Sequence, residues 1–322
     1  MASELAAAAQ FIQIHDSFMI LVHVRPDGDA IGAALACAHM LSHLGKSCRL
    51  VHESAIPVKY QFLPLSDRFE VFEAISPVEA VIAVDCGDRK QMGKGIQAIG
   101  VDTQLLNIDH HRTNDRFGTV NLVDMEAAAT CQILYHLAKT LDVPFFPELA
   151  VCIYTGILFD TGGFRYSNTT QEIHAIGAEM IAAGVSPYDV SDRVLETFTW
   201  PQLQLLKECL PTIQRDDSGK LAWIVTTRHV LELTKAREDE CEGLVDFARN
   251  IEGVEVGVAF RESGDGRIKV SLRSKYYVDV SEIAVEFSGG GHARAAGCMV
   301  EGSLKEVMEK VLTAVQTRLT EA

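Results

Sequence analysis

Carboxylate and imidazole side chains recur at four places where an apolar run of this sequence ends. These places are the segments HVRPDGD (23–29), VDCGD (84–88), IDHH (108–111) and LFDTGGF (158–164). Carboxylates that converge repel one another and raise each other's pKa unless a cation neutralises them. Asp, imidazole and water are the ligands of Mn²⁺ or Mg²⁺, and two such ions bridged by a shared carboxylate suit phosphoester hydrolysis. The residue types therefore predict a metal site with hydrolytic chemistry.

Each segment also has an ordinary structural explanation when it is taken alone. A D-G-D sequence usually forms a turn, and an Asp after a strand often caps the next helix. Asp88 and Asp124 are candidates for such caps, and His39 and His136 are typical of the core or the surface of a helix. Four acidic segments in consecutive positions of this kind are hard to explain by chance, so the metal site is the favoured interpretation.

Strands of a parallel sheet would bring these segments together. Buried strands are predicted by the apolar runs at 18–25, 47–54, 79–88 and 103–111. Helices are predicted by the apolar spacing at 33–45, 126–140 and 148–164. Apolar strands that alternate with helices indicate an α/β fold with a parallel sheet. Such sheets bind ligands outside the carboxyl ends of their strands.

The pattern changes after about residue 190, which predicts a second domain. We expect a catalytic domain at 1–190, a connecting helix at 191–213 and a smaller α+β domain at 214–322. The elements predicted for that domain are strands at 220–227, 253–260 and 267–274, a glycine-rich turn at 288–297 and a helix at 303–319.

Charge and cysteine content narrow the class of protein. The formal net charge of −15 argues against binding to long duplex nucleic acid, which needs many Lys and Arg contacts to phosphate. A small phosphorylated substrate remains compatible with it. The eight cysteines form no C-x-x-C pair and are expected to be reduced thiols. Neither a signal peptide nor an apolar stretch of about 18 residues is recognisable, so we expect a cytoplasmic protein without a membrane span.

The ordered set HVRPDGDAIG, VDCGD, IDHHRTN and GILFDTGGF resembles the DHH phosphoesterase superfamily, and SGGGHARAAG (288–297) resembles the signature of the accompanying DHHA1 domain. The resemblance covers roughly residues 10–320. Its two-domain plan is similar to that of the nanoRNase/pAp-phosphatase group. RecJ exonucleases carry extra domains, membrane-anchored cyclic-dinucleotide phosphodiesterases carry N-terminal spans, and family II pyrophosphatases end in a different second domain.

The resemblance implies two Mn²⁺ ions, or Mg²⁺ or another divalent ion, held by six residues. His23 and Asp27 would ligate one ion, and Asp29 and His110 the other. Asp85, as the bridge, and Asp160 would complete the cluster.

The resemblance also implies roles around the substrate. His111 would face the substrate phosphate, and Asp109 would orient a histidine. Asn114 either fixes the loop or is a turn residue, and the second explanation is favoured. The second domain would contact phosphate through Arg273, Gly289, Gly290, Gly291 and His292, and Arg294 is a weaker candidate.

The expected function is Mn²⁺-dependent hydrolysis of short 5′-phosphorylated oligoribonucleotides and of 3′-phosphoadenosine 5′-phosphate (pAp), by a possible homodimer. One alternative is a pyrophosphatase or polyphosphatase, although the glycine turn, Tyr276 and Tyr277 favour a nucleotide. The others are a soluble cyclic-dinucleotide phosphodiesterase and a non-enzymatic nucleotide-binding protein. Sequence alone separates linear from cyclic dinucleotides poorly, because the two could share one cleft.

Overall fold

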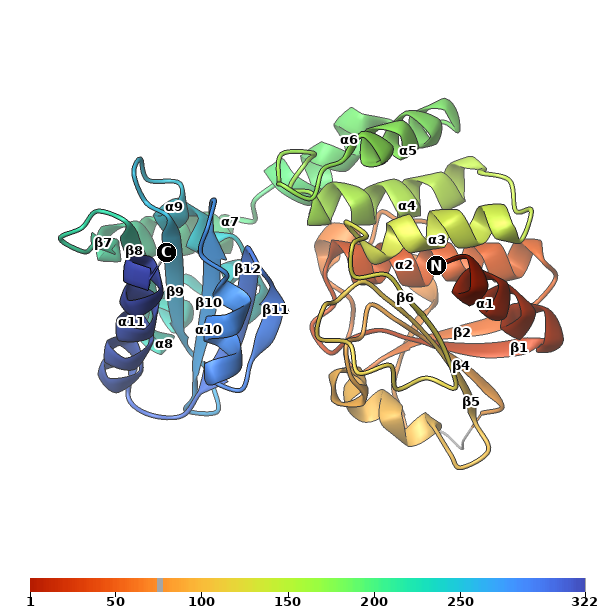
Figure 1. Cartoon of the computed structure of the whole chain (residues 1–322), viewed down its shortest axis with the longest axis horizontal. Coiled ribbons are helices and arrows are strands. Elements are labelled where there is room, and N and C mark those ends of the chain that lie inside the picture. The colour runs from red at the N-terminus through yellow and green to blue at the C-terminus, as the bar shows by residue number, and fades with distance from the viewer. Residues whose placement is uncertain (74–77, 322) are drawn as a thin grey trace. The chain divides into compact units, whose positions relative to one another are not determined.

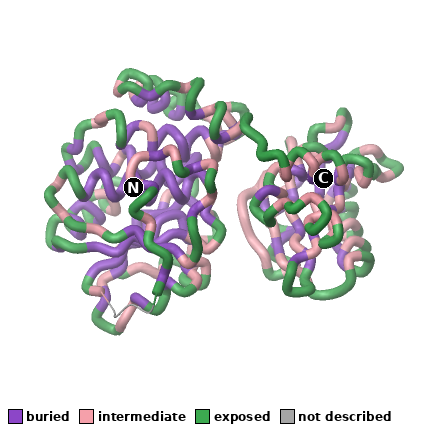
Figure 2. The backbone as a smooth tube through the Cα atoms, turned by 180° about the vertical axis from the view of Figure 1, so that it is seen from behind, coloured by how far each residue is buried: buried purple, intermediate pink, exposed green. Residues whose placement is uncertain are grey.

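The computed structural model describes residues 1–73 and 78–321. The chain forms two compact units, Met1–Thr197 and Phe198–Ala322, each built around its own sheet (Figure 1). The buried residues gather in the sheet and in the adjoining helices of each unit (Figure 2).

The first unit contains a six-stranded parallel sheet in the order β3-β2-β1-β4-β5-β6. Its strands are β1 (Ser17–Leu21), β2 (Ser47–His52), β3 (Phe69–Val71), β4 (Ala80–Val84), β5 (Gln104–Asp109) and β6 (Val120–Val123). β4 reads AVIAV and is buried along its whole length, as expected for a parallel strand covered on both faces.

Helices cover both faces of this sheet. The α-helices are α1 (Ala2–Ile14), α2 (Gly28–His43), α3 (Thr130–Thr140), α4 (Pro147–Asp160), α5 (Gln171–Ala182) and α6 (Pro187–Ser191). The shorter segments are the 3-10 helices η1 (Val58–Tyr60), η2 (Ser66–Arg68) and η3 (Arg89–Ala98) and the π-helical turn η4 (Asp192–Glu196). α2, α3 and α4 pack against one another in the main core. η3 adds Met92 and Ala98 to a smaller core on the other face.

The second unit contains a mixed sheet in the order β11-β12-β10-β9-β8-β7, in which β8 and β9 are parallel and the other pairs antiparallel. Its strands are β7 (Gln214–Arg215), β8 (Leu221–Thr226), β9 (Val256–Glu262), β10 (Ile268–Ser274), β11 (Gly290–His292) and β12 (Ala295–Val300). Its helices are α7 (Trp200–Cys209), η5 (Leu210–Thr212), α8 (Arg228–Thr234), η6 (Glu238–Cys241), α9 (Leu244–Arg249), α10 (Val280–Glu286) and α11 (Leu304–Glu321).

Most of the predicted architecture is confirmed. The fold is α/β with a parallel sheet, followed by a smaller α+β unit. The edge strands β3 and β6 were not predicted. The glycine-rich segment 288–297 was expected as a turn, but it forms most of the hairpin β11–β12. The segment 191–213, expected as a connecting helix, divides into η4, α7 and η5, and the predicted domain boundaries stay a prediction.

None of the helices in the described part of the chain is long and apolar enough to span a membrane.

Candidate metal centre and phosphate-binding surface

Three neighbouring strands deliver the first part of the site to the carboxyl edge of the parallel sheet. His23 follows β1, Asp85 follows β4, and β5 ends at Asp109, with His110 and His111 directly after it. Because β1, β4 and β5 are adjacent in the sheet, residues that are far apart in the chain meet at one edge.

The start of α2 delivers two further carboxylates. Asp27 caps the helix, since its Oδ1 accepts the backbone N–H of Asp29 (3.0 Å) and of Ala30 (3.1 Å). Asp29 lies in the first turn and is completely buried. Its two oxygens accept the N–H groups of Thr130 (2.6 Å) and Cys131 (3.0 Å) at the start of α3. The D-G-D sequence is therefore a helix start that fixes both carboxylates.

Asp85 is the central residue of the cluster. Its Oδ2 lies 3.5 Å from His23 Nε2, and its Oδ1 accepts the hydroxyl of Thr130 at 2.9 Å. The backbone has a left-handed conformation here, with φ of 57°, which few residue types other than Gly, Asn and Asp adopt readily.

Three groups of side chains at this edge could hold a metal ion, with ligand atoms within 4.8 Å of one another. These groups are His23–Asp27–Asp85, Asp29–Asp85–His110 and Asp85–Asp109–His111. Asp85 belongs to each of them. A carboxylate shared between groups of ligands is the arrangement that a two-metal site requires.

The ring of His110 is oriented by the backbone. Its Nδ1 lies 3.2 Å from the carbonyl oxygen of Ala127, and a carbonyl only accepts, so Nδ1 carries the hydrogen. The Nε2 atom lies 3.1 Å from Asp160, 3.7 Å from Asp85 and 3.9 Å from Asp29. A backbone contact of this kind is what fixes metal-binding histidines in proteins. The donor set therefore fits a divalent cation.

Burial and charge shift the pKa values in this cluster. Burial and the neighbouring carboxylates of Asp85 and Asp160 raise the pKa of Asp29 well above its usual value. Burial alone would lower the pKa of His110, but Asp160, Asp85 and Asp29 together raise it well above the usual value. Burial opposes ionisation of Asp85, yet its contacts with three histidines lower its pKa. A metal ion that bound here would displace protons, so its affinity would rise with pH.

His111 is held by a buried acid. Its Nδ1 lies 2.7 Å from Asp109 Oδ1, and Asp109 is completely buried. Burial lowers the pKa of His111, but the hydrogen bond to Asp109 outweighs it and raises the pKa to about 9. The imidazole is therefore cationic near neutral pH, which suits contact with an anion.

Asn114 completes this chain of contacts. Its Nδ2 donates to Asp109 Oδ2 at 2.6 Å and also lies within hydrogen-bond distance of Asn107 Oδ1 and the Cys86 carbonyl. Its Oδ1 accepts the backbone N–H of Arg116. The favoured explanation of Asn114 as only a turn residue is wrong, because its side chain fixes the acid that orients His111.

We expect Asn114→Ala to reduce kcat about 10- to 100-fold, the range typical of residues that orient a ligand, while the chain stays folded. Because Asn114 acts through Asp109 and His111, the pH–rate profile should change as well, which a merely structural loss would not produce. Asn121→Ala is the matched control, since the Asn121 side chain bonds the backbone N–H and carbonyl of Gly118 and no carboxylate of the described site. An unchanged kcat and pH profile in Asn114→Ala would contradict the prediction.

A glycine in α4 allows α2 to approach closely enough to place Asp29. A Cβ atom on Gly156 would lie 2.4 Å from Asp29 Oδ1 and 2.3 Å from Cys131 Sγ. Real Cβ atoms do not approach other heavy atoms that closely, so the position requires glycine. Its absent side chain makes room for the Asp29 carboxylate between three helices.

In the second unit, Arg273 and His292 lie in one row across three strands. Arg273 of β10 pairs with Ala295 of β12, and His292 of β11 pairs with the same alanine. Directly opposed residues of antiparallel strands point to the same face. The flanking Leu272 and Ala296 belong to the core on the other face. Arg273 and His292 therefore share the face turned away from that core.

The glycines before His292 have a packing role of their own. A Cβ on Gly289 would lie 2.2 Å from the Gly297 carbonyl oxygen, and one on Gly291 would lie 2.5 Å from that of Ala295. The hairpin thus needs glycine at these two positions in order to form. Arg294 donates to the carbonyl of Val278 at 2.6 Å, which is a structural role.

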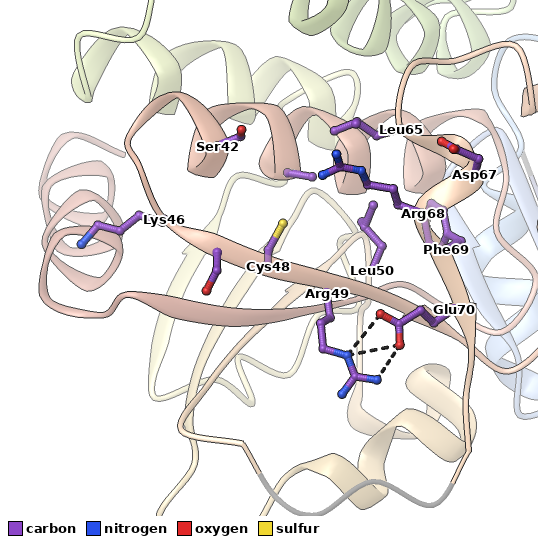
Figure 3. Close-up of a pocket in the computed structure, with 12 residues that line it drawn as sticks. Ser42, Lys46, Cys48, Arg49, Leu50, Leu65, Asp67, Arg68, Phe69 and Glu70 are labelled. Atoms are coloured by element: carbon purple, nitrogen blue, oxygen red, sulfur yellow. Dashed lines mark hydrogen bonds and ion pairs between the residues drawn. The ribbon is translucent and has the colours of Figure 1, made fainter.

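A separate hollow of about 490 Å³ lies on the first unit, beside β2 and β3 (Figure 3). Two of the cationic side chains that line it are paired with acids. Arg49 Nε donates to both carboxylate oxygens of Glu70, at 3.2 Å each, and Lys46 Nζ donates to Asp16 Oδ1 at 2.7 Å. Its lining contains none of the site residues predicted above, so it is distinct from the metal centre.

The structure brings together all six side chains predicted as ligands, and their ligation stays a prediction. Asp160 joins them from the last residue of α4, which confirms the helix predicted at 148–164. Sequence reasoning missed Thr130. The available signal was a hydroxyl residue near the start of the helix predicted at 126–140, since the first N–H groups of a helix bind carboxylates. The helix itself begins at Thr130.

Comparison with known proteins defines the class. Residues 17–157 match the model of the DHH family, N-terminal domain, and residues 227–321 match the DHHA1 domain. The chain belongs to the DHH family of metal-dependent phosphoesterases and is a hydrolase of that class.

Its relatives narrow the class to one group. The chain is 36% identical to the bifunctional oligoribonuclease and PAP phosphatase NrnA of Thermus thermophilus, over 94% of this chain and 90% of that protein. It is 27% identical to a probable enzyme of the same name from Streptococcus mutans, over 89% and 90% of the two chains. An exopolyphosphatase-related protein from Bacteroides fragilis has a similar structure, with a TM-score of 0.87, 25% identity and coverage of 100% of this chain and 96% of that one.

Proposed function

We propose that this protein is a Mn²⁺-dependent phosphoesterase that hydrolyses short 5′-phosphorylated oligoribonucleotides and pAp. The observation that carries the proposal is the sharing of Asp85 between the groups His23–Asp27–Asp85 and Asp29–Asp85–His110. The names of the relatives support the substrate class. The eight cysteines, which are thiols and not disulfides, support a reducing compartment such as the cytoplasm.

Two Mn²⁺ ions would be held by the six clustered ligands, with Asp85 between them. Bound divalent ions lower the pKa of a water nucleophile and neutralise charge on phosphoryl oxygens. In this proposal Asp29 and His110 are kept in place by the backbone contacts of α3 and Ala127.

His111 is the proposed catalytic residue on the substrate side. Its imidazolium stabilises the charge that develops on the phosphoryl oxygens. Asp109 supports that charge through the 2.7 Å contact to Nδ1, and is a positioning residue.

The second unit would recognise a terminal phosphate. Arg273 can bond a phosphate bidentately, and His292 lies in the same cross-strand row. The backbone N–H groups of Gly289, Gly290 and Gly291 would add further donors. Recognition of an end, in place of an internal backbone, limits the substrate to short chains.

A polyphosphatase is the second candidate, because a protein of very similar fold is described as exopolyphosphatase-related. A cyclic-dinucleotide phosphodiesterase with the same centre is the third. Both share the metal chemistry and differ in what the second unit must bind.

The experiment is a comparison of turnover with Mn²⁺ on a 5′-phosphorylated diribonucleotide, pAp, cyclic di-AMP and pyrophosphate. We expect rapid hydrolysis of the first two, and loss of activity after chelation that added Mn²⁺ restores. Faster turnover of pyrophosphate or of the cyclic substrate would contradict the proposed substrate and leave the metal centre intact. Inactivity on all four would contradict the proposal of an enzyme of this kind.

A further inference from the structure

The loop after β10 carries two exposed tyrosines. The side chain of Tyr276 is 78% exposed and that of Tyr277 is 42% exposed. They lie three and four residues after Arg273 in the chain, at the end of β10 near which Arg273 and His292 form their row. We propose that Tyr276 stacks on the base of the nucleotide whose phosphate binds at this row. The inference rests on the proposed function and extends it to the recognition of a base.

A buried acid fixes the backbone of this loop. Glu255 is 3% exposed. Its carboxylate accepts the N–H groups of Tyr276 (3.0 and 3.1 Å), Tyr277 (2.8 Å) and Val278 (3.1 Å). A buried carboxylate must be compensated in this way, so any rearrangement of the loop would leave its charge without these donors. The loop is therefore held in one conformation before substrate binds.

Polar side chains fix the other end of the loop. The Val278 carbonyl accepts the hydroxyl of Ser274 and the guanidinium of Arg294, both at 2.6 Å. Lys275 donates to a backbone carbonyl at 3.0 Å. Lys275 and Arg294 are thus engaged in the structure of the loop, and the more exposed of its two rings is that of Tyr276.

An exposed ring on a fixed backbone suits base stacking. Little conformational entropy is lost when it binds, and an aromatic ring accepts any base because every base has a π-face. Three residues of chain span at most about 11 Å, so Arg273 and Tyr276 lie within reach of one nucleotide. Tyr277 is the less suitable ring, because the ammonium of Lys220 lies 5.8 Å from its centroid.

The test compares pAp with the corresponding ribose bisphosphate that lacks the base. With Tyr276→Ala we expect kcat/KM for pAp to fall about 5- to 150-fold, the range that stacking energies correspond to. The effect should appear in KM, with kcat little changed. The base-free substrate should be turned over equally by both proteins, and Tyr276→Phe should behave as the wild type.

Leu233→Ala is the control. Leu233 is 60% exposed and belongs to α8, which follows β8 at the other end of the sheet from the tyrosine loop. An unchanged kcat/KM for pAp in Tyr276→Ala would overturn the inference, and so would an equal loss on both substrates. If the wild type hydrolyses neither substrate, the proposed function fails separately. In that case the affinity of the Mn²⁺-loaded protein for adenosine monophosphate still tests Tyr276, and equal affinity in the variant would overturn the inference.

Discussion

Asp85→Asn is expected to lower kcat/KM at least about 1,000-fold, equivalent to about 4 kcal/mol of transition-state stabilisation, and to reduce the number of Mn²⁺ ions bound. Asp85 belongs to all three candidate ligand groups at the sheet edge, so an amide there weakens every group at once. Asparagine is the right substitution because it tolerates the left-handed backbone at this position. Alanine would add backbone strain to the loss of charge.

Asp88→Asn provides the matched control. Asp88 caps η3 by accepting the N–H groups of Lys90 and Gln91, and asparagine caps helices equally well. Turnover and metal content, measured by kinetics and by elemental analysis, should be unchanged in this variant. If Asp85→Asn retained both bound metal and turnover within 10-fold of the wild type, the bridging role would be wrong.

Gly156→Ala is expected to lower both the stability and the activity of the protein. Helix propensity favours alanine over glycine by about 1 kcal/mol. The new Cβ would instead collide with Asp29 Oδ1 and Cys131 Sγ at 2.4 and 2.3 Å. Such overpacking costs about 1–3 kcal/mol, and the gain in helix propensity offsets part of it. We therefore expect a net loss of up to about 2 kcal/mol and a fall in Tm of up to about 8 °C. The collision would also displace the Asp29 carboxylate. Because a misplacement of about 1 Å can lower a reaction rate about 100-fold, kcat should fall together with Tm.

Gly177→Ala is the control that separates the gain in helix propensity from the cost of overpacking. A Cβ on Gly177 in α5 would lie 3.4 Å from its nearest neighbour, the ring of Phe164, which is ordinary contact. Its Tm should be equal to or above that of the wild type, and its activity unchanged. In Gly156→Ala/Cys131→Ala, removal of the sulfur should recover part of the Tm, whereas kcat should stay low because Asp29 remains crowded. A wild-type Tm and kcat in the single Gly156→Ala variant would contradict the close approach.

The cluster of candidate ligands was predictable from the sequence because acidic and imidazole side chains at the ends of apolar runs form a recognisable pattern. His23, Asp85 and His110 each follow an apolar run, and a parallel sheet brings such ends to one edge. The role of Asn114 was misinterpreted and that of Thr130 was not predicted. Both roles depend on a contact with an acidic residue that is distant in sequence or set by the folded loop: Asp109 for Asn114, and Asp29 and Asp85 for Thr130. Nothing in the sequence near Asn114 indicates that Asp109 lies 2.6 Å from its side chain.

The central strands of the fold were predictable from the sequence, whereas an edge strand and a hairpin were not. β1 and β4 are almost entirely apolar and buried on both faces, so their composition identifies them. β3 is three residues long, and its second and third residues are exposed, so it has no apolar pattern to recognise. The hairpin β11–β12 was hidden by its glycines, which indicate a turn in sequence but here permit two strands to pack closely.

The order of the site residues along the chain has a consequence for synthesis of the protein. The contacts of His110 include Asp160, the last residue of α4, whereas His23 follows the first strand. Ribosomes add about 5–20 residues per second, so on the order of ten seconds separate the emergence of the first of these residues from that of the last. Parallel sheets also fold slowly, because their contacts close long loops. The centre therefore cannot be complete until about half of the chain has been made, and a chain truncated before α4 would keep His110 without its Asp160 partner.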